Sequence, residues 1–92
     1  MSTNIDFNAD QKRYEITVDD TLAGFSEVQE TDEEVTFTHT VVFDQFEGKG
    51  LAGELVTEAL DDVRVRGKKV VPRCAYVKRF IDKHPEYANL LA

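Results

Sequence analysis

The chain has 92 residues, of which 11 are Lys or Arg and 18 are Asp or Glu, so its formal net charge is −7. This length allows one domain, residues 1–92, because domains begin at roughly 50 residues. The acidic balance argues against non-specific nucleic-acid binding, no apolar run approaches the roughly 20 residues of a membrane span, and a single cysteine excludes a disulfide framework or a cysteine-rich zinc site. We therefore expect a cytoplasmic protein without a metal, as a monomer or weak dimer.

The residue pattern of the N-terminal half predicts strands. Residues 1–11 are polar without a periodic pattern, so we expect a loose lead-in. Residues 12–18 alternate apolar and polar side chains, which predicts a half-buried strand. The acidic pair at positions 19 and 20 is a turn signal, and residues 21–30 complete a predicted hairpin. Residues 35–43 form the strongest strand, because almost every side chain is β-branched or aromatic.

Strand alternation also predicts which side chains share a face. Within residues 21–30, Ser26 lies on one face and Ala23 on the other. One parity of the third strand is apolar apart from a histidine: Val35, Phe37, His39, Val41 and Phe43. A histidine on such a face is most often a core residue hydrogen-bonded to the backbone, although imidazole also suits a base near neutral pH.

The periodicity changes in the C-terminal half. Apolar residues recur at helical spacing over residues 51–63, which predicts an amphipathic helix that Gly67 ends. Residues 68–71 predict a short strand, and residues 75–83 predict a second helix that Pro85 stops. The order is β-β-β-α-β-α. It predicts an α+β fold in which a right-handed crossover helix adds a parallel strand to an antiparallel meander.

A glycine-rich turn separates the third strand from the first helix: Glu47-Gly48-Lys49-Gly50-Leu51-Ala52-Gly53. Glycine permits positive φ and a close approach to a ligand, and a helix N-terminus offers unpaired N–H groups. A pyrophosphate is the natural occupant of such a turn, and Lys49 adds a positive charge. The spacing matches neither the Walker loop nor the dinucleotide-binding motif, so a purely structural turn remains an alternative.

The run from Val41 to Ala52 resembles the acetyl-coenzyme A motif Q/R-x-x-G-x-G/A of the GNAT acetyltransferase superfamily. Gly50 and Ala52 match its last two fixed positions, whereas Glu47 stands where the family usually has Gln or Arg. The small single-domain branch of that superfamily is similar over about residues 12–91. The shared segments are Thr38-His39-Thr40, Gly48-Lys49-Gly50, Pro72-x-Cys74-x-Tyr76-Val77 and His84-Pro85-Glu86-Tyr87.

The resemblance implies a GNAT-like fold and an acetyl-CoA-dependent N-acetyltransferase. It implies that main-chain N–H groups of residues 48–52, beside Glu47, hold the pyrophosphate of coenzyme A. By the same resemblance we expect the strand edge at Val41, Val42 and Phe43 to pair with the pantetheine amides, and Lys78 and Arg79 to lie near the ribose phosphate. A bulge or splay near Phe43 opens the sheet for the thioester.

The protein needs to supply little beyond orientation, because the cofactor carries the activated acyl group. A backbone N–H near Val42 is the candidate donor to the thioester oxygen. Cys74, beside Arg73 at a predicted helix start, is placed to accept the acetyl group or to protonate the leaving thiol; a small buried hydrophobe is the alternative. Tyr76 could hold the proton-donating role that a tyrosine often has in the larger superfamily, or pack with Phe80 in the core.

The charge is divided unevenly along the chain. Residues 1–47 hold 12 acidic and 2 basic residues, a net of −10, and residues 48–92 hold 6 acidic and 9 basic, a net of +3. The acidic half could attract a cationic amine, either a small molecule or a protein side chain. Larger relatives usually carry two helices after their first strand, for which Asp19-Asp20 leaves no space, so an open acceptor side is expected. Two alternatives remain: an acyl-CoA-binding module without efficient turnover, and a non-catalytic α+β interaction domain.

Overall fold

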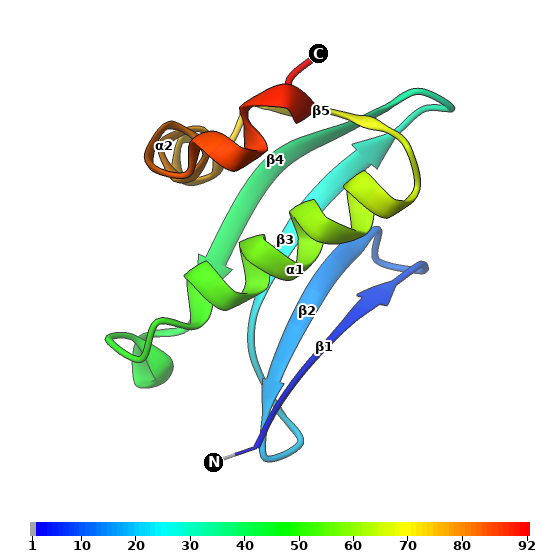
Figure 1. Ribbon diagram of the computed structural model, residues 1–92. Coiled ribbons are helices and arrows are strands. Elements are labelled where there is room, and N and C mark those ends of the chain that lie inside the picture. The colour runs from blue at the N-terminus through cyan, green and yellow to red at the C-terminus, as the bar shows by residue number, and fades with distance from the viewer. Residues whose placement is uncertain (1) are drawn as a thin grey trace.

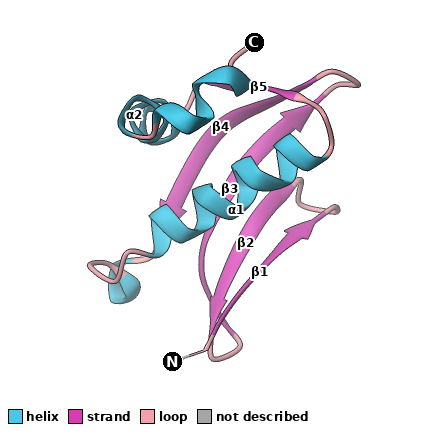
Figure 2. Cartoon of the chain, viewed as in Figure 1, coloured by secondary structure: helices cyan, strands magenta, loops and turns pink. Residues whose placement is uncertain are grey.

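The computed structural model describes residues 2–92. Its elements are β1 (Thr3–Asn8), β2 (Arg13–Val18), β3 (Thr21–Glu30), β4 (Glu34–Val42), η1 (Asp44–Phe46), α1 (Leu51–Val65), β5 (Lys69–Pro72), α2 (Ala75–Lys83) and η2 (Pro85–Leu90), where η is a 3-10 helix (Figure 1). The strands form one sheet in chain order, antiparallel from β1 to β4 and parallel between β4 and β5. Figure 2 shows α1 crossing one face of that sheet. The expected α+β fold, with a crossover helix before a parallel strand, is confirmed.

The loose lead-in expected for residues 1–11 is wrong over Thr3–Asn8, which forms β1. This strand pairs antiparallel with β2, from Thr3 opposite Val18 to Asn8 opposite Arg13. Ile5 packs against the core, and the ring of Phe7 meets Tyr14 edge-on, 4.9 Å between centroids. Two apolar residues make too short an alternation to stand out in the sequence, and the backbone pairing that adds the strand leaves no mark there. Met1 lies outside the described residues.

The hairpin between β2 and β3 is confirmed, but one face assignment is not. Asp19 and Asp20 have φ of 48° and 69°, the left-handed pair that a two-residue hairpin turn requires. The register then passes from Ile16–Gly24 to Thr17–Leu22, so Ala23 is an extra residue in β3. This bulge turns Ala23 into the core, fully buried on the side of Ser26, and the prediction that separated them is wrong.

A second bulge reverses the faces of β4. Glu27 is opposite His39 and Val28 is opposite Phe37, which leaves Thr38 as the extra residue. Beyond it His39 is exposed, whereas Thr40 turns toward the helices and contacts core side chains. The predicted place of His39 on the apolar face is therefore wrong, because a shift of one residue moves every later side chain to the other side. The bulge expected near Phe43 lies at Thr38 instead.

The core lies between the sheet and the helices. The buried stripe of α1 meets the inward faces of β2, β3 and β4, and α2 adds Val77 and Ile81. The C-terminal segment is fixed to α1, because the Tyr87 hydroxyl donates to Asp61 Oδ1 at 2.8 Å and Arg64 donates to the Glu86 carbonyl at 2.6 Å. Both predicted helices are confirmed. Neither they nor any other helix within residues 2–92 has the length and apolar character to cross a membrane.

Candidate functional site

Pairing between β4 and β5 stops halfway along β4. β5 is matched only with Glu34–Phe37, because the chain leaves the sheet after Pro72. The N–H of Cys74 then donates to the Phe37 carbonyl at 2.8 Å, which holds the start of α2 against this fork. Within residues 2–92 no strand covers the rest of β4 on this side. The result is a free main-chain edge, to which an extended ligand can add by hydrogen bonding.

Val42 directs its N–H toward this free edge. The next residue, Phe43, donates its N–H to the carbonyl of Ala23 in β3 at 2.9 Å. Successive main-chain groups of a strand point to opposite edges, so the N–H of Val42 points away from β3. Thr40, two residues earlier, has the same orientation as Val42. The free edge therefore offers the main-chain groups of Thr40 and Val42.

The turn between β4 and α1 presents a run of free N–H groups. Gly48 and Gly50 have φ of +78° and +73°, in the left-handed region that favours glycine. The first helical bond of α1 runs from Glu54 N–H to the Gly50 carbonyl at 3.2 Å. No acceptor within residues 2–92 engages the N–H groups of positions 48–53. Consecutive donors at the positive end of a helix dipole favour an anion such as pyrophosphate.

A cavity of about 310 Å³ joins the free edge to the glycine turn. It is lined by Thr40 and Val42 of β4, by Phe46, by the turn and first helical residues Glu47, Gly48, Gly50, Leu51, Ala52 and Gly53, and by Tyr76 of α2. The structure thus brings together several residues that the sequence assigned to one site: Val42, Glu47, Gly48, Gly50, Leu51, Ala52 and Tyr76.

Tyr76 covers the cavity from the side of α2. A Cβ placed on Gly53 would lie 3.9 Å from the Tyr76 hydroxyl, so this hydroxyl stands over the first turn of α1. Its ring packs near Phe80, with centroids 6.4 Å apart. The aromatic ring therefore belongs to the packing of α2, while the hydroxyl faces the cavity.

Other residues assigned to the site from the sequence lie elsewhere. His39 is exposed on the face of the sheet opposite Thr40, across the strand pair from Glu27. Val41 and Phe43 direct their main-chain groups toward β3 rather than to the free edge. Three cationic residues are exposed and lie outside the cavity lining: Lys49, Lys78 and Arg79.

Cys74 lies directly behind the cavity wall. It is the N-cap residue of α2, only 8% exposed, and its Sγ donates to Thr40 Oγ1 at 3.5 Å. Thr40 Oγ1 also lies 2.9 Å from the Oγ of Ser26, which is fully buried. Sequence reasoning missed this chain of a thiol and two hydroxyls. Its members share a face only because of the bulge at Thr38, and the sequence carries no mark of that bulge.

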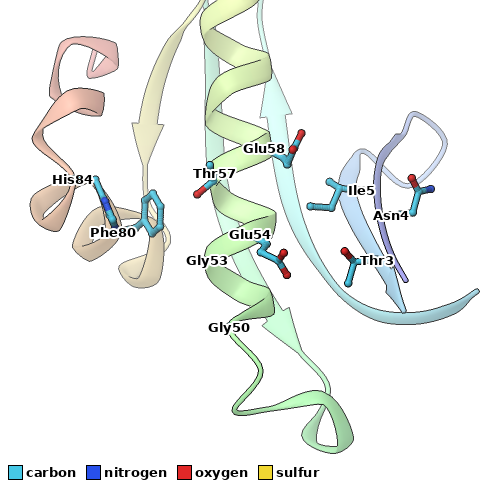
Figure 3. A pocket seen from close by; sticks show the side chains of 10 residues that line it. All are labelled: Thr3, Asn4, Ile5, Gly50, Gly53, Glu54, Thr57, Glu58, Phe80 and His84. Atoms are coloured by element: carbon cyan, nitrogen blue, oxygen red, sulfur yellow. The ribbon is translucent and has the colours of Figure 1, made fainter. Parts of the chain in front are cut away.

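A larger cavity of about 730 Å³ runs along the outer side of α1 and meets the smaller one at Gly50 and Gly53. Figure 3 shows Glu54 and Glu58 projecting from α1 on the side of β1, opposite Phe80 of α2. Two carboxylates disfavour an anion there, which leaves the smaller cavity as the better anion site. Within residues 2–92 no cluster of three His, Cys, Asp or Glu side chains could hold a metal ion.

Comparison with known proteins identifies a family and a fold. The family model described as GCN5-related N-acetyl-transferase matches residues 13–90. No curated protein matches the chain. Among solved structures, a GCN5-like protein from Staphylococcus aureus superimposes with a TM-score of 0.73 at 18% identity, over 97% of this chain and 87% of that one.

Two larger structures share the same core. A ribosomal-protein-alanine N-acetyltransferase from Brucella melitensis gives a TM-score of 0.63 at 24% identity, over 87% of this chain and 60% of that chain. A GNAT family acetyltransferase from Elizabethkingia anophelis, solved with acetyl-CoA bound, gives 0.62 at 13% identity, over 79% and 51%. The chain therefore spans between half and three fifths of these two proteins, and identities this low establish the fold alone.

Proposed function

Because the chain belongs to the GCN5-related N-acetyltransferase family, we propose that its 92 residues act as a single domain that transfers the acetyl group of acetyl-coenzyme A to an amine. One observation carries the proposal. The cavity joins a free strand edge to a run of unengaged N–H groups. Coenzyme A is an amide-containing arm attached to a pyrophosphate, so each part of it has a matching surface along this one cavity.

In the proposed complex the main chain, not side chains, holds the cofactor. The N–H groups of Gly48 to Ala52 bind the pyrophosphate, and the main-chain carbonyl of Val42 at the free edge accepts from a pantetheine amide. Glu47 lines the cavity and its charge opposes an anion, while its own N–H is engaged by the Asp44 carbonyl at 3.2 Å. Lys49 offsets that charge from the same turn. The exposed side of α2 carries Lys78 and Arg79 toward the ribose phosphate.

The proposed reaction is a direct attack of a neutral amine on the thioester. The N–H of Val42 donates to the carbonyl oxygen, on which negative charge develops. Tyr76 is the candidate that faces the cavity, so its hydroxyl supplies a proton to the leaving thiolate. Cys74 stands behind Thr40 and reaches the acetyl group only if Thr40 moves aside. His39 is exposed on the opposite face of the sheet, outside the cavity lining.

The test measures the turnover of acetyl-CoA in the presence of amines. The signal is the free thiol of coenzyme A that each turnover releases. We expect thiol release that depends on the amine, with saturation in acetyl-CoA. Binding of coenzyme A without turnover would favour the alternative of a module that holds acyl-CoA. Absence of both binding and turnover contradicts the proposal and leaves an interaction domain.

The role of Cys74 has its own test. Mass spectrometry after incubation with acetyl-CoA detects an acetyl group on Cys74 if the thiol is an acceptor. The Cys74→Ala variant is compared with the parent in the turnover measurement. Turnover that survives this substitution assigns Cys74 to packing and to the hydrogen bond with Thr40.

A further inference from the structure

Ser26 is the only polar residue within residues 2–92 that is fully buried. A buried hydroxyl must place its single O–H on an acceptor, because an unpaired donor in the core is costly. No buried side-chain polar atom in the described chain lacks a partner, and the one side-chain partner of Ser26 is Thr40, 2.9 Å away. The distance alone allows either hydroxyl to donate, and the need to satisfy the buried O–H of Ser26 assigns the donor role to Ser26.

Cys74 takes up the other lone pair of Thr40. Its thiol donates to Thr40 Oγ1 at 3.5 Å, from the N-cap of α2. A hydroxyl oxygen has two acceptor lone pairs and one donor hydrogen. With Ser26 and Cys74 on the lone pairs, the hydrogen of Thr40 cannot point at either of them. Because Thr40 lines the cavity, its O–H is free to donate to a ligand there.

Thr40 also marks the inner end of the cavity. Two residues of β4 line it, Val42 near the glycine turn and Thr40 near the fork where β5 leaves the sheet. At about 3.3 Å per residue, Thr40 lies about 7 Å farther along the strand from the turn than Val42 does. If acetyl-coenzyme A binds with its pyrophosphate at the turn and its pantetheine chain along β4, its thioester end therefore points toward Thr40.

We propose that Thr40 donates a hydrogen bond to the thioester sulfur of acetyl-coenzyme A and that Ser26 is a positioning residue for it; this rests on the proposed function. When the amine nitrogen bonds to the carbonyl carbon, the C–S bond breaks and its electron pair stays on sulfur. The hydrogen bond stabilises that charge, and Thr40 gives up no proton. The proton that sulfur finally gains comes from Tyr76, which regains one from the attacking amine through solvent.

The test compares three variants with the parent in kcat and in the Kd of coenzyme A. Thr40→Val keeps the shape and removes the hydroxyl, so we expect kcat to fall about 10- to 100-fold with Kd within about threefold. Thr40→Ser keeps the hydroxyl and retains most of kcat. Ser26→Ala keeps the Thr40 hydroxyl but removes the hydrogen bond that orients it. We therefore expect kcat to fall by a smaller factor, about 3- to 10-fold.

Thr36→Val is the matched control, because Thr36 lies on the same strand but outside the cavity lining. It should leave kcat and Kd unchanged. A Thr40→Val protein with parental kcat overturns the inference while the proposed function stands. A parent that neither binds coenzyme A nor transfers acetyl groups overturns the proposed function itself, and the inference with it.

A second measurement needs no variant and so does not depend on the folding of Thr40→Val. A donor aimed at sulfur binds a thiolate more tightly than a thiol. The affinity of the parent for coenzyme A should therefore rise between about pH 7 and pH 10, as the ligand's thiol ionises. Desulfo-coenzyme A, which lacks the sulfur, is the control. The same pH dependence for both ligands contradicts the contact.

Discussion

Gly50 and Gly67 flank the two ends of α1 and have the same φ. Both have φ of +73°, and an added Cβ would meet no atom within 4 Å at either position. Any cost of a side chain therefore comes from the backbone conformation alone, about 1–2 kcal/mol in each case. The two glycines differ in their surroundings, since only Gly50 lines the cavity between β4 and α1.

This pair separates a structural from a functional role of the glycine turn. Gly50→Ala and Gly67→Ala should lower the free energy of unfolding by similar amounts, measured by urea denaturation. Only Gly50→Ala should weaken coenzyme A binding, by about tenfold, because a displaced N–H costs a charge-assisted hydrogen bond. Equal affinities for the two variants would remove the turn from the binding site.

From the environment of Tyr87 we predict that the free energy of unfolding falls at alkaline pH. Burial, together with the hydrogen bond to Asp61, raises the pKa of Tyr87 to about 12, above the usual value of 10. Between these values the unfolded chain releases a proton that the folded chain keeps, so stability falls as pH rises from about 10 to about 12. The slope due to this one group is at most about 1.4 kcal/mol per pH unit.

The measurement is urea unfolding of the parent and of Tyr87→Phe across that pH range. The variant should show a shallower decline, although part of the decline remains. Burial and the hydrogen bond to Asp62 also raise the pKa of Tyr14, which both proteins contain. Identical slopes in parent and variant would contradict the assignment to Tyr87.

At the scale of elements, β3 and β4 approach each other closely at Gly24. Gly24 is opposite Val42, and a Cβ on Gly24 would lie 2.5 Å from the carbonyl oxygen of Val41. Gly24→Ala should therefore push the two strands apart and lower the free energy of unfolding by about 1–3 kcal/mol. Thermal and urea denaturation measure the loss.

Gly53→Ala is the matched control for this prediction. A Cβ there meets nothing closer than the Tyr76 hydroxyl at 3.9 Å, an ordinary contact, and Gly53 lies in the first turn of α1. Alanine favours a helix over glycine, so stability should rise by up to about 1 kcal/mol. A loss for Gly53→Ala as large as that for Gly24→Ala would show that the close approach in the sheet is not the cause.

The elements themselves could be predicted from periodicity, but the pairing between them could not. The helix over residues 51–65 and the strand over residues 13–18 have alternations long enough to fix both their type and their buried face. The extra residues at Ala23 and Thr38 are determined by how two strands meet, and a single strand's sequence carries no sign of them. The sequence therefore located the glycine-rich segment between the third predicted strand and the first helix, whereas the orientation of Thr40 came only from the structure.

At the scale of the molecule, the uneven charge bears on the choice of acceptor. The net charge of −10 over residues 1–47 falls on the segment that contains β1 to β4, η1 and their turns, and the net charge of +3 falls on the remainder, which includes both α-helices. A cationic amine should therefore be acetylated faster than a neutral or an acidic one at low ionic strength. The difference should shrink between about 0.01 M and 1 M salt, as the screening length falls from about 30 Å to about 3 Å.

Initial rates with matched cationic and acidic amines over this salt range test the electrostatic preference. Equal rates without a salt dependence would remove the charge argument and leave the cofactor site untouched, because that site rests on main-chain groups. The two questions, which acceptor and which cofactor, are thus separable in one set of experiments.

The central claim is that the turn between β4 and α1 and the free edge of β4 hold coenzyme A together. The most direct measurement is a titration of the isotope-labelled protein with coenzyme A, followed by the amide signals of each residue in NMR spectra. We expect saturable shifts at positions 48–53 and at Val42, with Gly67 at the far end of α1 unaffected. Unchanged signals at these positions in millimolar coenzyme A, or shifts confined to other parts of the chain, would contradict the claim.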